Sequence, residues 1–186
     1  MTIQKTLSCA VRSAPGFTLI ETLVVLAIAV IITAVAAPAF KGALAKYRIE
    51  NQQHGLRDLL QLAHDNAVGE RVLTICTSSN GTSCTPSANW QQGQIVFVDH
   101  GTVGVVDEDD EVIQYAQSVK GGVPLEATVE ATGADFTRGF IHFEQGKPDI
   151  KKAVRFSACH KGDKARQISI NMYGHIWSSK GATTCA

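Results

Sequence analysis

Gly16-Phe17-Thr18-Leu19-Ile20-Glu21 opens an apolar stretch that continues almost unbroken to Phe40. About 20 apolar residues are enough for a helix to cross a bilayer. Glu21 lies inside this stretch, and a carboxylate in the hydrocarbon costs roughly 2.5–3.5 kcal/mol or more unless it has a partner or reaches the interface. Residues 17–40 are therefore predicted to form a membrane-spanning helix in which Glu21 has a function.

Residues 1–16 form a short polar leader that contains Lys5 and Arg12 and has no apolar core of its own. An ordinary secretory signal carries its apolar region before the cleavage site, which follows a small-x-small motif. Here the apolar region begins only after the junction between Gly16 and Phe17. The leader is therefore not an ordinary secretory signal.

The order of polar leader, Gly16, Phe17 and Glu21 resembles the type IV prepilin family, and Pro38 stands where that family commonly carries a helix-kinking proline. The resemblance implies that a membrane peptidase cuts after Gly16 and methylates the new amine of Phe17. It also implies that Glu21 pairs with the Phe17 amine of an adjacent subunit and sets the register of a filament. Such a buried charge pair sets register better than it adds stability.

A second interpretation of Glu21 needs no partner. The residue lies about four helical rises, or ~6 Å, below the helix start, so its side chain can extend to the lipid head groups. This interpretation explains neither the glycine junction nor the polar leader.

The cysteines indicate the compartment. Cys9 would leave with the leader, which converts five cysteines into four, namely Cys76, Cys84, Cys159 and Cys185. An even set outside the membrane indicates two disulfides in an oxidising compartment. Basic residues flank the span on both sides, so they do not set its orientation. The cysteines do, because they require the C-terminal domain to face the periplasm.

Four cysteines allow three pairings. Cys76 and Cys84 bracket Asn80-Gly81, a strong hairpin signal, and are predicted to pair across a tight turn. Cys159 would then pair with Cys185 and attach the C-terminal tail to the domain. Zinc binding is the competing interpretation, but the sequence has neither a CxxC motif nor a histidine pair at ligand spacing. No metal is expected.

Beyond the span the periodicity changes twice. From residue 41 to 71 apolar residues recur at spacings near three and four, as on one face of an amphipathic helix. They are Leu44, Tyr47, Leu56, Leu59, Leu60, Ala63 and Ala67. From residue 72 to 186 short alternating runs are separated by Gly, Pro, Asn and Asp, as in antiparallel sheets. The runs are Val72–Cys76, Gln94–Asp99, Val112–Gln117, Leu125–Glu130, Phe140–Phe143, Ala153–Ser157 and Gln167–Met172.

These patterns predict an α+β, pilin-like fold. One long N-terminal transmembrane and amphipathic helix packs on a single β-rich globular domain of roughly seven antiparallel strands. The predicted segments are the cleaved leader 1–16, the transmembrane or filament-core helix 17–40, the amphipathic helix 41–71 and the periplasmic β-rich domain 72–186.

The globular part carries a second resemblance. It is similar to the H-type minor pseudopilins of type II secretion and to the related FimT/FimU-type minor pilins. The residues that carry it are Ala63-His64-Asp65-Asn66-Ala67, Leu73-Thr74-Ile75-Cys76, Cys84, Trp90, Gly93, Val96-Phe97-Val98-Asp99 and Val112-Ile113. Many FimT-like members end with a Gly-Arg-x-Arg strand, but the matching stretch here is Gly174-His175-Ile176-Trp177. A function that depends on those arginines is therefore not expected.

Charge is segregated although the formal net charge is zero. Residues 107–111 are five consecutive acids, which favours a solvated turn over a calcium site because they lack an EF-hand pattern. Residues 147–166 are strongly basic, through Lys147, Lys151, Lys152, Arg155, Lys161, Lys164 and Arg166. This stretch is interpreted as a solvated face, a docking site for an acidic neighbour, or a nucleic-acid contact.

Enzymatic motifs are missing: the sequence has no GxSxG, HExxH, P-loop or suitably placed GxGxxG motif. Its six histidines are scattered, without an evident nucleophile or orienting partner. No catalysis and no cofactor are expected.

The expected function is that of a structural minor pseudopilin or pilin subunit. It would act in filament initiation or tip assembly and in protein secretion, from an inner-membrane anchor with a cytoplasmic N-terminus. The expected partners are other pilin-like subunits, the prepilin peptidase and the inner membrane. The alternative is a DNA-binding minor pilin for natural transformation. Type II secretion and type IV pili share the N-terminal motif, so the sequence leaves both open.

Overall fold

The computed structural model describes residues 16–119 and 122–185. Lys5, Cys9 and Arg12 of the predicted leader lie outside the described residues. The chain divides into two units, residues 1–41 and 42–186.

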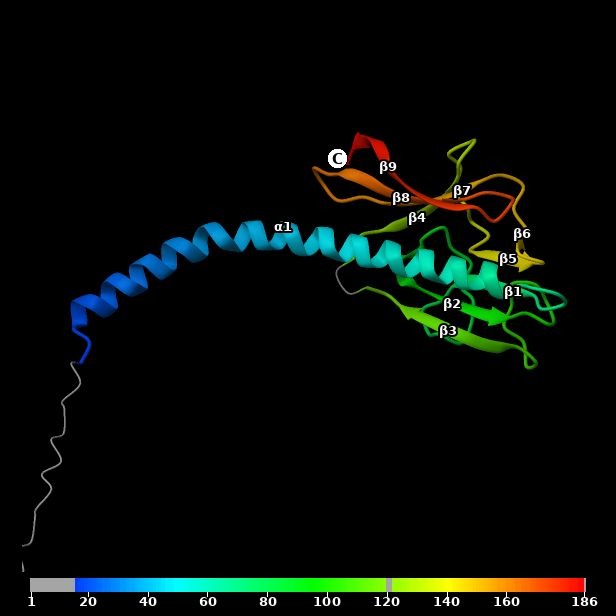
Figure 1. Ribbon diagram of the computed structural model, residues 1–186, viewed down its shortest axis with the longest axis horizontal. Helices are drawn as coiled ribbons and strands as arrows, with labels where there is room; N and C mark the ends of the chain where they lie inside the picture. Colours follow the sequence, from blue (N-terminus) through cyan, green and yellow to red (C-terminus); the bar gives the residue numbers. More distant parts are fainter. Residues whose placement is uncertain (1–15, 120–121, 186) are drawn as a thin grey trace, which may run out of the picture. The chain divides into compact units, whose positions relative to one another are not determined.

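Helix α1 (Leu19–Asn66) is the one long helix that the sequence predicts (Figure 1). Within the second unit, the three- and four-residue spacing buries Leu56, Leu59, Leu60 and Ala63 against the domain. The amphipathic stripe was partly misassigned, because Tyr47 is exposed and Ile49 is buried instead.

The helix ends at Asn66, five residues before the predicted end at Arg71. The Asn66 side chain donates to the Leu62 carbonyl, a local bond that asparagine favours over helix continuation. Gly69 then adopts a positive φ of 67°, which is incompatible with a helix. The kink predicted at Pro38 stays a prediction.

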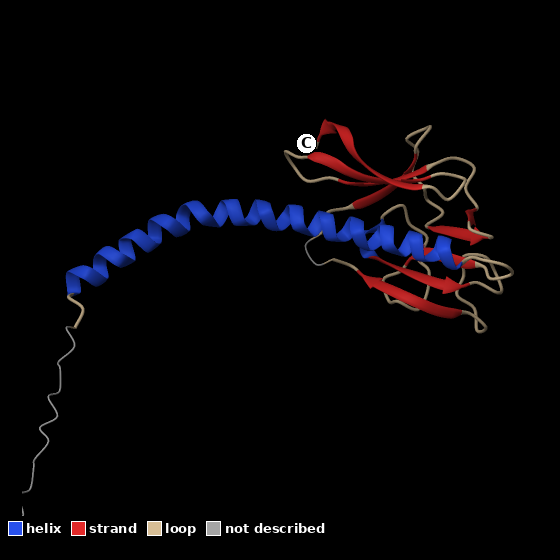
Figure 2. Ribbon diagram, viewed as in Figure 1, coloured by secondary structure: helices blue, strands red, loops and turns tan. Residues whose placement is uncertain are grey.

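In the described part of the chain, nine strands follow in two antiparallel sheets (Figure 2). The first sheet has the order β3-β2-β1-β5-β6, with β1 (Leu73–Thr77), β2 (Gly93–Val98), β3 (Glu111–Gln117), β5 (Phe140–Glu144) and β6 (Lys147–Pro148). The second has the order β4-β7-β8-β9, with β4 (Leu125–Val129), β7 (Val154–Ala158), β8 (Lys164–Ile170) and β9 (Ile176–Thr184). A short 3-10 helix, η1 (Trp90–Gln92), precedes β2.

The α+β fold class is confirmed, and each of the predicted alternating runs overlaps a strand. Strands β6 and β9 were missed among these runs. Strand β9 carries Ser178, Ser179 and Lys180 exposed, so its sequence lacks the apolar alternation that marks a half-buried strand. It is held by its pairing with β8, a long-range contact that local periodicity does not contain.

The turn at Asn80-Gly81 does not form the hairpin that the sequence predicts. Strand β1 pairs instead with β2 and β5. The Asn80 Oδ1 accepts from the amides of Thr82 and Ser83, each at 3.0 Å, so its side chain builds a compact loop rather than a two-residue reversal.

Two buried clusters lie on opposite faces of the first sheet. The larger one joins α1 to both sheets, and fully buried Trp90 packs edge-on against Phe156 with 4.8 Å between ring centroids. The smaller one contains Cys76, Ile95 and Phe97. Because strands β1 and β2 are buried on both faces, the loops that follow them must cover the second face.

Candidate functional site

The predicted processing site lies just before the helix. Gly16 and Phe17 are exposed and outside regular structure, and α1 begins two residues after Phe17. The amide of Glu21 donates to the Thr18 Oγ1 at 3.3 Å. Thr18 is therefore the N-cap of α1, and Glu21 is the third residue of its first turn.

This capping contact was missed in the sequence, although its signal was present. Thr18-Leu19-Ile20-Glu21 has the S/T-x-x-E spacing of a capping box. A carboxylate in the first turn also interacts favourably with the helix dipole. Glu21 thus has a local function at the helix start, besides the role between subunits that the sequence predicts. Among the described residues it has no ion-pair partner.

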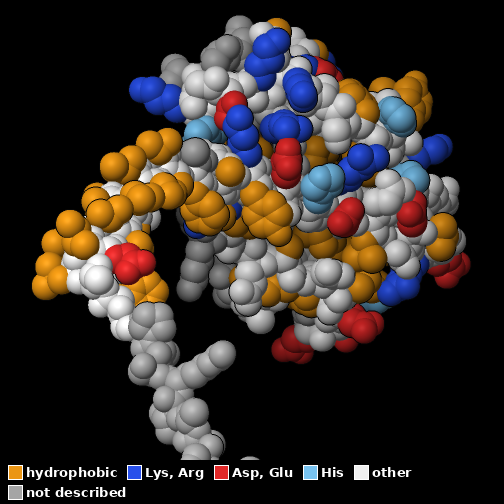
Figure 3. Space-filling model, turned by 60° about the vertical axis from the view of Figure 1, so that its left-hand side comes forward, with side chains coloured by type: hydrophobic (Ala, Val, Ile, Leu, Met, Phe, Trp, Pro, Cys, Tyr) orange, Lys and Arg blue, Asp and Glu red, His pale blue; other side chains and the backbone are white. Residues whose placement is uncertain are grey.

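The first unit carries an apolar helix surface. The large apolar side chains between Leu19 and Phe40 are all more than half exposed in the isolated chain. Figure 3 shows hydrophobic side chains covering this part of the helix, with one acidic side chain near its start. The hydroxyls of Thr22 and Thr33 donate to carbonyls one turn earlier, so they are satisfied within the helix. By length and composition the helix can cross a membrane.

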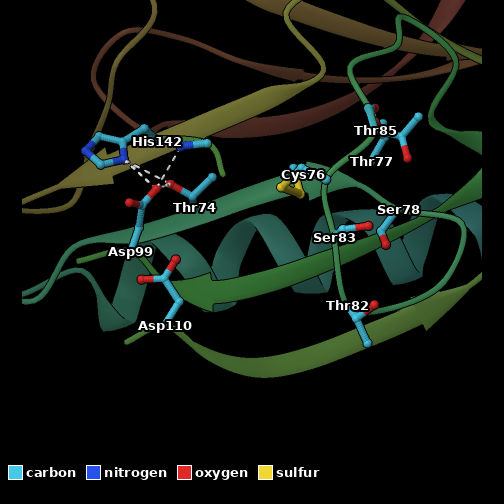
Figure 4. The surroundings of a disulfide bond; sticks show 12 residues. Thr74, Cys76, Thr77, Ser78, Thr82, Ser83, Thr85, Asp99, Asp110 and His142 are labelled. Atoms are coloured by element: carbon cyan, nitrogen blue, oxygen red, sulfur yellow. Dashed lines mark hydrogen bonds and ion pairs between the residues drawn. A yellow bond between two sulfur atoms is a disulfide. The ribbon is translucent and has the colours of Figure 1, made fainter. Parts of the chain in front are cut away.

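The first disulfide closes the loop after β1 (Figure 4). It joins Cys76 to Cys84 with 5.6 Å between Cα atoms, and Cys76 is fully buried. The amide of Thr85 donates to the Thr77 carbonyl at 2.7 Å and closes the same loop. The disulfide and its loop therefore cover the smaller cluster, whose buried residues in the described part of the chain include none from α1.

The second disulfide joins Cys159, at the end of β7, to Cys185, at the end of the chain. The Cys185 amide donates to the Asp163 carbonyl at 2.8 Å, and the Gly162 amide donates to the Cys185 carbonyl at 3.1 Å. The bond therefore ties the tail beyond β9 to the turn between β7 and β8. Both pairs are those that the sequence predicts.

Replacing both Cys159 and Cys185 with serine is expected to lower the free energy of unfolding by about 3–4 kcal/mol. The sequence separation of 26 residues sets this value, because the crosslink removes loop entropy from the unfolded chain. Urea denaturation of the full chain in nonionic detergent measures the change. Mass spectrometry without reductant should find no free thiol in the mature wild-type protein. A peptide that links Cys84 to Cys159 would show that the pairing is wrong.

Carboxylates of the acidic run accept hydrogen bonds from backbone amides in the loop between β2 and β3. The Asp110 carboxylate accepts from the amides of His100 and Asp107, each at 2.8 Å. The Asp107 carboxylate accepts from the Thr102 amide at 2.7 Å. Asp107 and Asp110 therefore bind the backbone of their own loop. Among the described residues no group of three or more His, Cys, Asp or Glu side chains is arranged to hold a metal.

One histidine has a partner that the sequence does not reveal. The His142 Nδ1 lies 2.9 Å from the Thr74 Oγ1, and Thr74 donates to the buried Asp99 carboxylate at 2.6 Å (Figure 4). The Gly104 amide donates to the same Asp99 oxygen at 3.0 Å. The single hydroxyl proton of Thr74 goes to Asp99, so His142 donates to Thr74 and does not act as its base. The arrangement secures the loop that begins at Asp99.

Two side chains near the end of α1 stabilise the charged form of a carboxylate. The hydrogen bond from the His64 side chain lowers the pKa of the Asp65 carboxyl below its ordinary value, and the Gln61 amide adds to the effect. Asp65 is exposed, so this pair adds little to stability.

The basic stretch does not form one continuous patch. Lys147 lies on β6 in the first sheet, and Lys151 and Lys152 precede β7 in the second. Lys161, Lys164 and Arg166 lie at the opposite end of the β7–β8 hairpin, because Ala158 pairs with Arg166 and Val154 with Ile170. Strand β7 has five residues and separates the two ends by roughly 15 Å.

Both arginines of this stretch form ion pairs. Arg155 pairs with Glu130, and Arg166 pairs with Glu50 of α1 at 2.6 Å. Lys161, Lys164 and the two lysines before β7 are exposed.

The C-terminal strand begins after a tight turn. Gly174 has a φ of 82°, and a Cβ there would meet His64 at 2.5 Å. His175 and Trp177 occupy the positions where FimT-like relatives carry arginine, and their rings stack at 5.6 Å. This strand presents aromatic rings and no guanidinium.

Two family models match the chain. The prokaryotic N-terminal methylation motif matches residues 12–37. The model of the type II transport protein GspH matches residues 53–174, which is more than half of the chain. The chain belongs to the GspH family. No curated protein and no solved structure matches it.

Membership in the GspH family confirms the resemblance found in the sequence. This GspH-family chain is of the type II secretion pseudopilin or type IV pilin kind, a structural class that associates with other pseudopilins. The methylation motif and the apolar helix indicate a membrane-anchored protein. The roles of Gly16, Phe17, Glu21 and Pro38 stay predictions.

Proposed function

We propose that this chain is a minor pseudopilin that joins the initiating or tip complex of a type II secretion pseudopilus and performs no catalysis. The match of the globular domain to GspH, together with the methylation motif in the same chain, carries the proposal. The precursor is anchored in the inner membrane with its C-terminal domain in the periplasm. Other pseudopilins and the prepilin peptidase are its partners.

Three features of the N-terminal unit support the assembly role. Gly16 and Phe17 are exposed ahead of the helix, where a peptidase can reach them. Glu21 is unpaired within the chain, among the described residues, and is therefore available to the Phe17 amine of a neighbour. The exposed apolar surface from Leu19 to Phe40 needs either lipid or other helices around it.

The alternative, a DNA-binding pilin for natural transformation, has weaker support. The basic stretch, residues 147–166, is split between the two ends of β7, and both arginines in it are paired with carboxylates. The strand that carries arginines in FimT-like relatives has His175 and Trp177 here. A phosphate contact is strongest where several unpaired cations lie together.

Deleting the gene and measuring exoprotein secretion, twitching motility and transformation in parallel tests the proposal. Secretion should be lost, while motility and transformation persist, and the wild-type gene should restore secretion. Loss of transformation alone would assign the protein to DNA uptake. Loss of motility alone would assign it to a type IV pilus.

A further inference from the structure

A cavity of about 270 Å³ lies on the globular domain between α1, β8 and β9. Four cationic side chains line it, and two of them form ion pairs with the carboxylates of Asp163 and Glu50. The cations are Lys46, Lys164, Arg166 and Lys180. We name this set the basic pocket. Figure 3 shows Lys and Arg side chains gathered on one face of the domain.

The two carboxylates leave the basic pocket with excess positive charge. Asp163 pairs with Lys46 at 3.3 Å, and Glu50 pairs with Arg166 at 2.6 Å. Lys164 and Lys180 are exposed and have no ion-pair partner among the described residues. Two ammonium groups therefore remain available to an anion.

Strand register places like charges together in this pocket. Arg166 of β8 lies directly opposite Lys180 of β9. Like charges at directly opposite positions of neighbouring strands are destabilising. Glu50 already pairs with Arg166, so Lys180 carries the charge that an anion at this position would balance.

The sequence position of Lys46 relates the basic pocket to the predicted membrane span. Lys46 follows Phe40, the last residue of the apolar stretch, by six residues. A chain of this length spans at most roughly 20 Å even when fully extended. The head-group layer of a bilayer adds several ångströms beyond its hydrocarbon core. While the chain is anchored, Lys46 and the pocket that it lines can therefore reach the lipid head groups.

Tyr47 supports the same location. It is 61% exposed although the helical spacing predicts it to be buried. Tyrosine is enriched at membrane interfaces, where its ring lies among the head groups and its hydroxyl reaches water. An exposed tyrosine next to Lys46 is typical of an interfacial residue.

We propose that the basic pocket binds the phosphate of an anionic phospholipid while the subunit is anchored in the membrane. The ammonium groups of Lys164 and Lys180 contact the phosphate, and Tyr47 contacts the glycerol region. This contact would hold the globular domain near the bilayer before the subunit leaves for the filament. The proposal rests on the membrane-anchored pseudopilin proposed above.

Native mass spectrometry of the full chain tests the proposal. The protein is kept in nonionic detergent and titrated with phosphatidylglycerol or phosphatidylcholine. Wild type should retain phosphatidylglycerol in preference to phosphatidylcholine. Lys164→Glu with Lys180→Glu should weaken phosphatidylglycerol binding at least about tenfold, because each basic residue near an anionic lipid contributes roughly fivefold.

Two control variants separate charge from folding. Lys151→Glu with Lys152→Glu makes the same charge change at the other end of β7 and should leave lipid binding unchanged. Lys164→Arg with Lys180→Arg keeps the charge and should retain binding. Equal binding of both lipids, or equal losses in the two Glu variants, would overturn the proposal.

Three further results would assign the pocket elsewhere and overturn the lipid proposal. The first is inorganic phosphate displacing the lipid at matched concentration, which would indicate a free-phosphate site. The second is salt-sensitive duplex DNA binding that depends on Lys164 and Lys180. The third is normal lipid binding by the Glu variant together with its exclusion from filaments, which would indicate an acidic neighbouring subunit. Because the lipid measurement needs no filament, its failure is distinguishable from failure of the proposed secretion role.

Discussion

A Gly16→Ala variant is expected to stay almost entirely uncleaved and to accumulate as a membrane-bound precursor. The prepilin resemblance implies a peptidase site that accepts a residue without a side chain. In the structure Gly16 is exposed, and a Cβ there would meet no atom within 4 Å. The substitution therefore leaves the fold intact, and any block acts on recognition by the peptidase. Gel mobility and mass spectrometry of the N-terminus measure cleavage and methylation.

Gly42→Ala and Gly55→Ala are matched controls for this experiment. Both glycines lie in α1, and an added Cβ at either would also meet nothing within 4 Å. Alanine in a helix is more favourable than glycine by up to about 1 kcal/mol, so both variants should fold and be cleaved normally. Wild-type processing of Gly16→Ala would refute the prepilin interpretation.

A Glu21→Gln variant is expected to be cleaved and to remain in the membrane, but to enter filaments poorly. Removing one partner of a buried charge pair costs about 3–5 kcal/mol, because the other charge is left uncompensated. That cost corresponds to a loss of more than about 100-fold in pairing with the Phe17 amine of a neighbour. The amount of subunit that crosslinks into the isolated filament fraction measures the effect.

Thr18→Ala separates the charge of Glu21 from its place in the capping box. It removes the Oγ1 that accepts from the Glu21 amide, at a cost of about 1 kcal/mol to the helix start, and keeps the carboxylate. Glutamine at position 21 retains the capping pattern and loses only the charge. Assembly should therefore fail in Glu21→Gln and persist in Thr18→Ala. Full assembly of Glu21→Gln would instead favour a carboxylate that reaches the head groups.

The N-terminal half of the protein could be predicted from the sequence because its signals are local. Gly16, Phe17 and Glu21 lie within six residues of one another, so their motif is read directly from the sequence. The apolar stretch to Phe40 forms its backbone hydrogen bonds within itself and needs no partner segment to become a helix. Backbone hydrogen bonds in a helix join residues four apart, so a continuous periodic pattern specifies it. The early end at Asn66 was missed because a side-chain bond to Leu62 competes there with the helix.

The strands were predicted in outline, but their arrangement was not. Alternation identifies a half-buried strand, and the runs around β1, β2 and β5 show it. It does not say which strands pair, so the division into two sheets and the polar strand β9 came only from the structure. The Asn80-Gly81 signal likewise predicts a reversal but not its partner strand.

The basic stretch shows most clearly what the sequence by itself could not determine. Residues 147–166 read as one charged segment, yet β7 carries Lys152 and Lys164 to opposite ends of a hairpin. Conversely, Lys46, Arg166 and Lys180 are far apart in the chain and line one pocket. Sequence determined which charges the protein has and which segment is long and apolar enough to cross a membrane. Only tertiary structure decided which charges meet, because strand register and helix packing are settled by burying a shared core across long sequence distances.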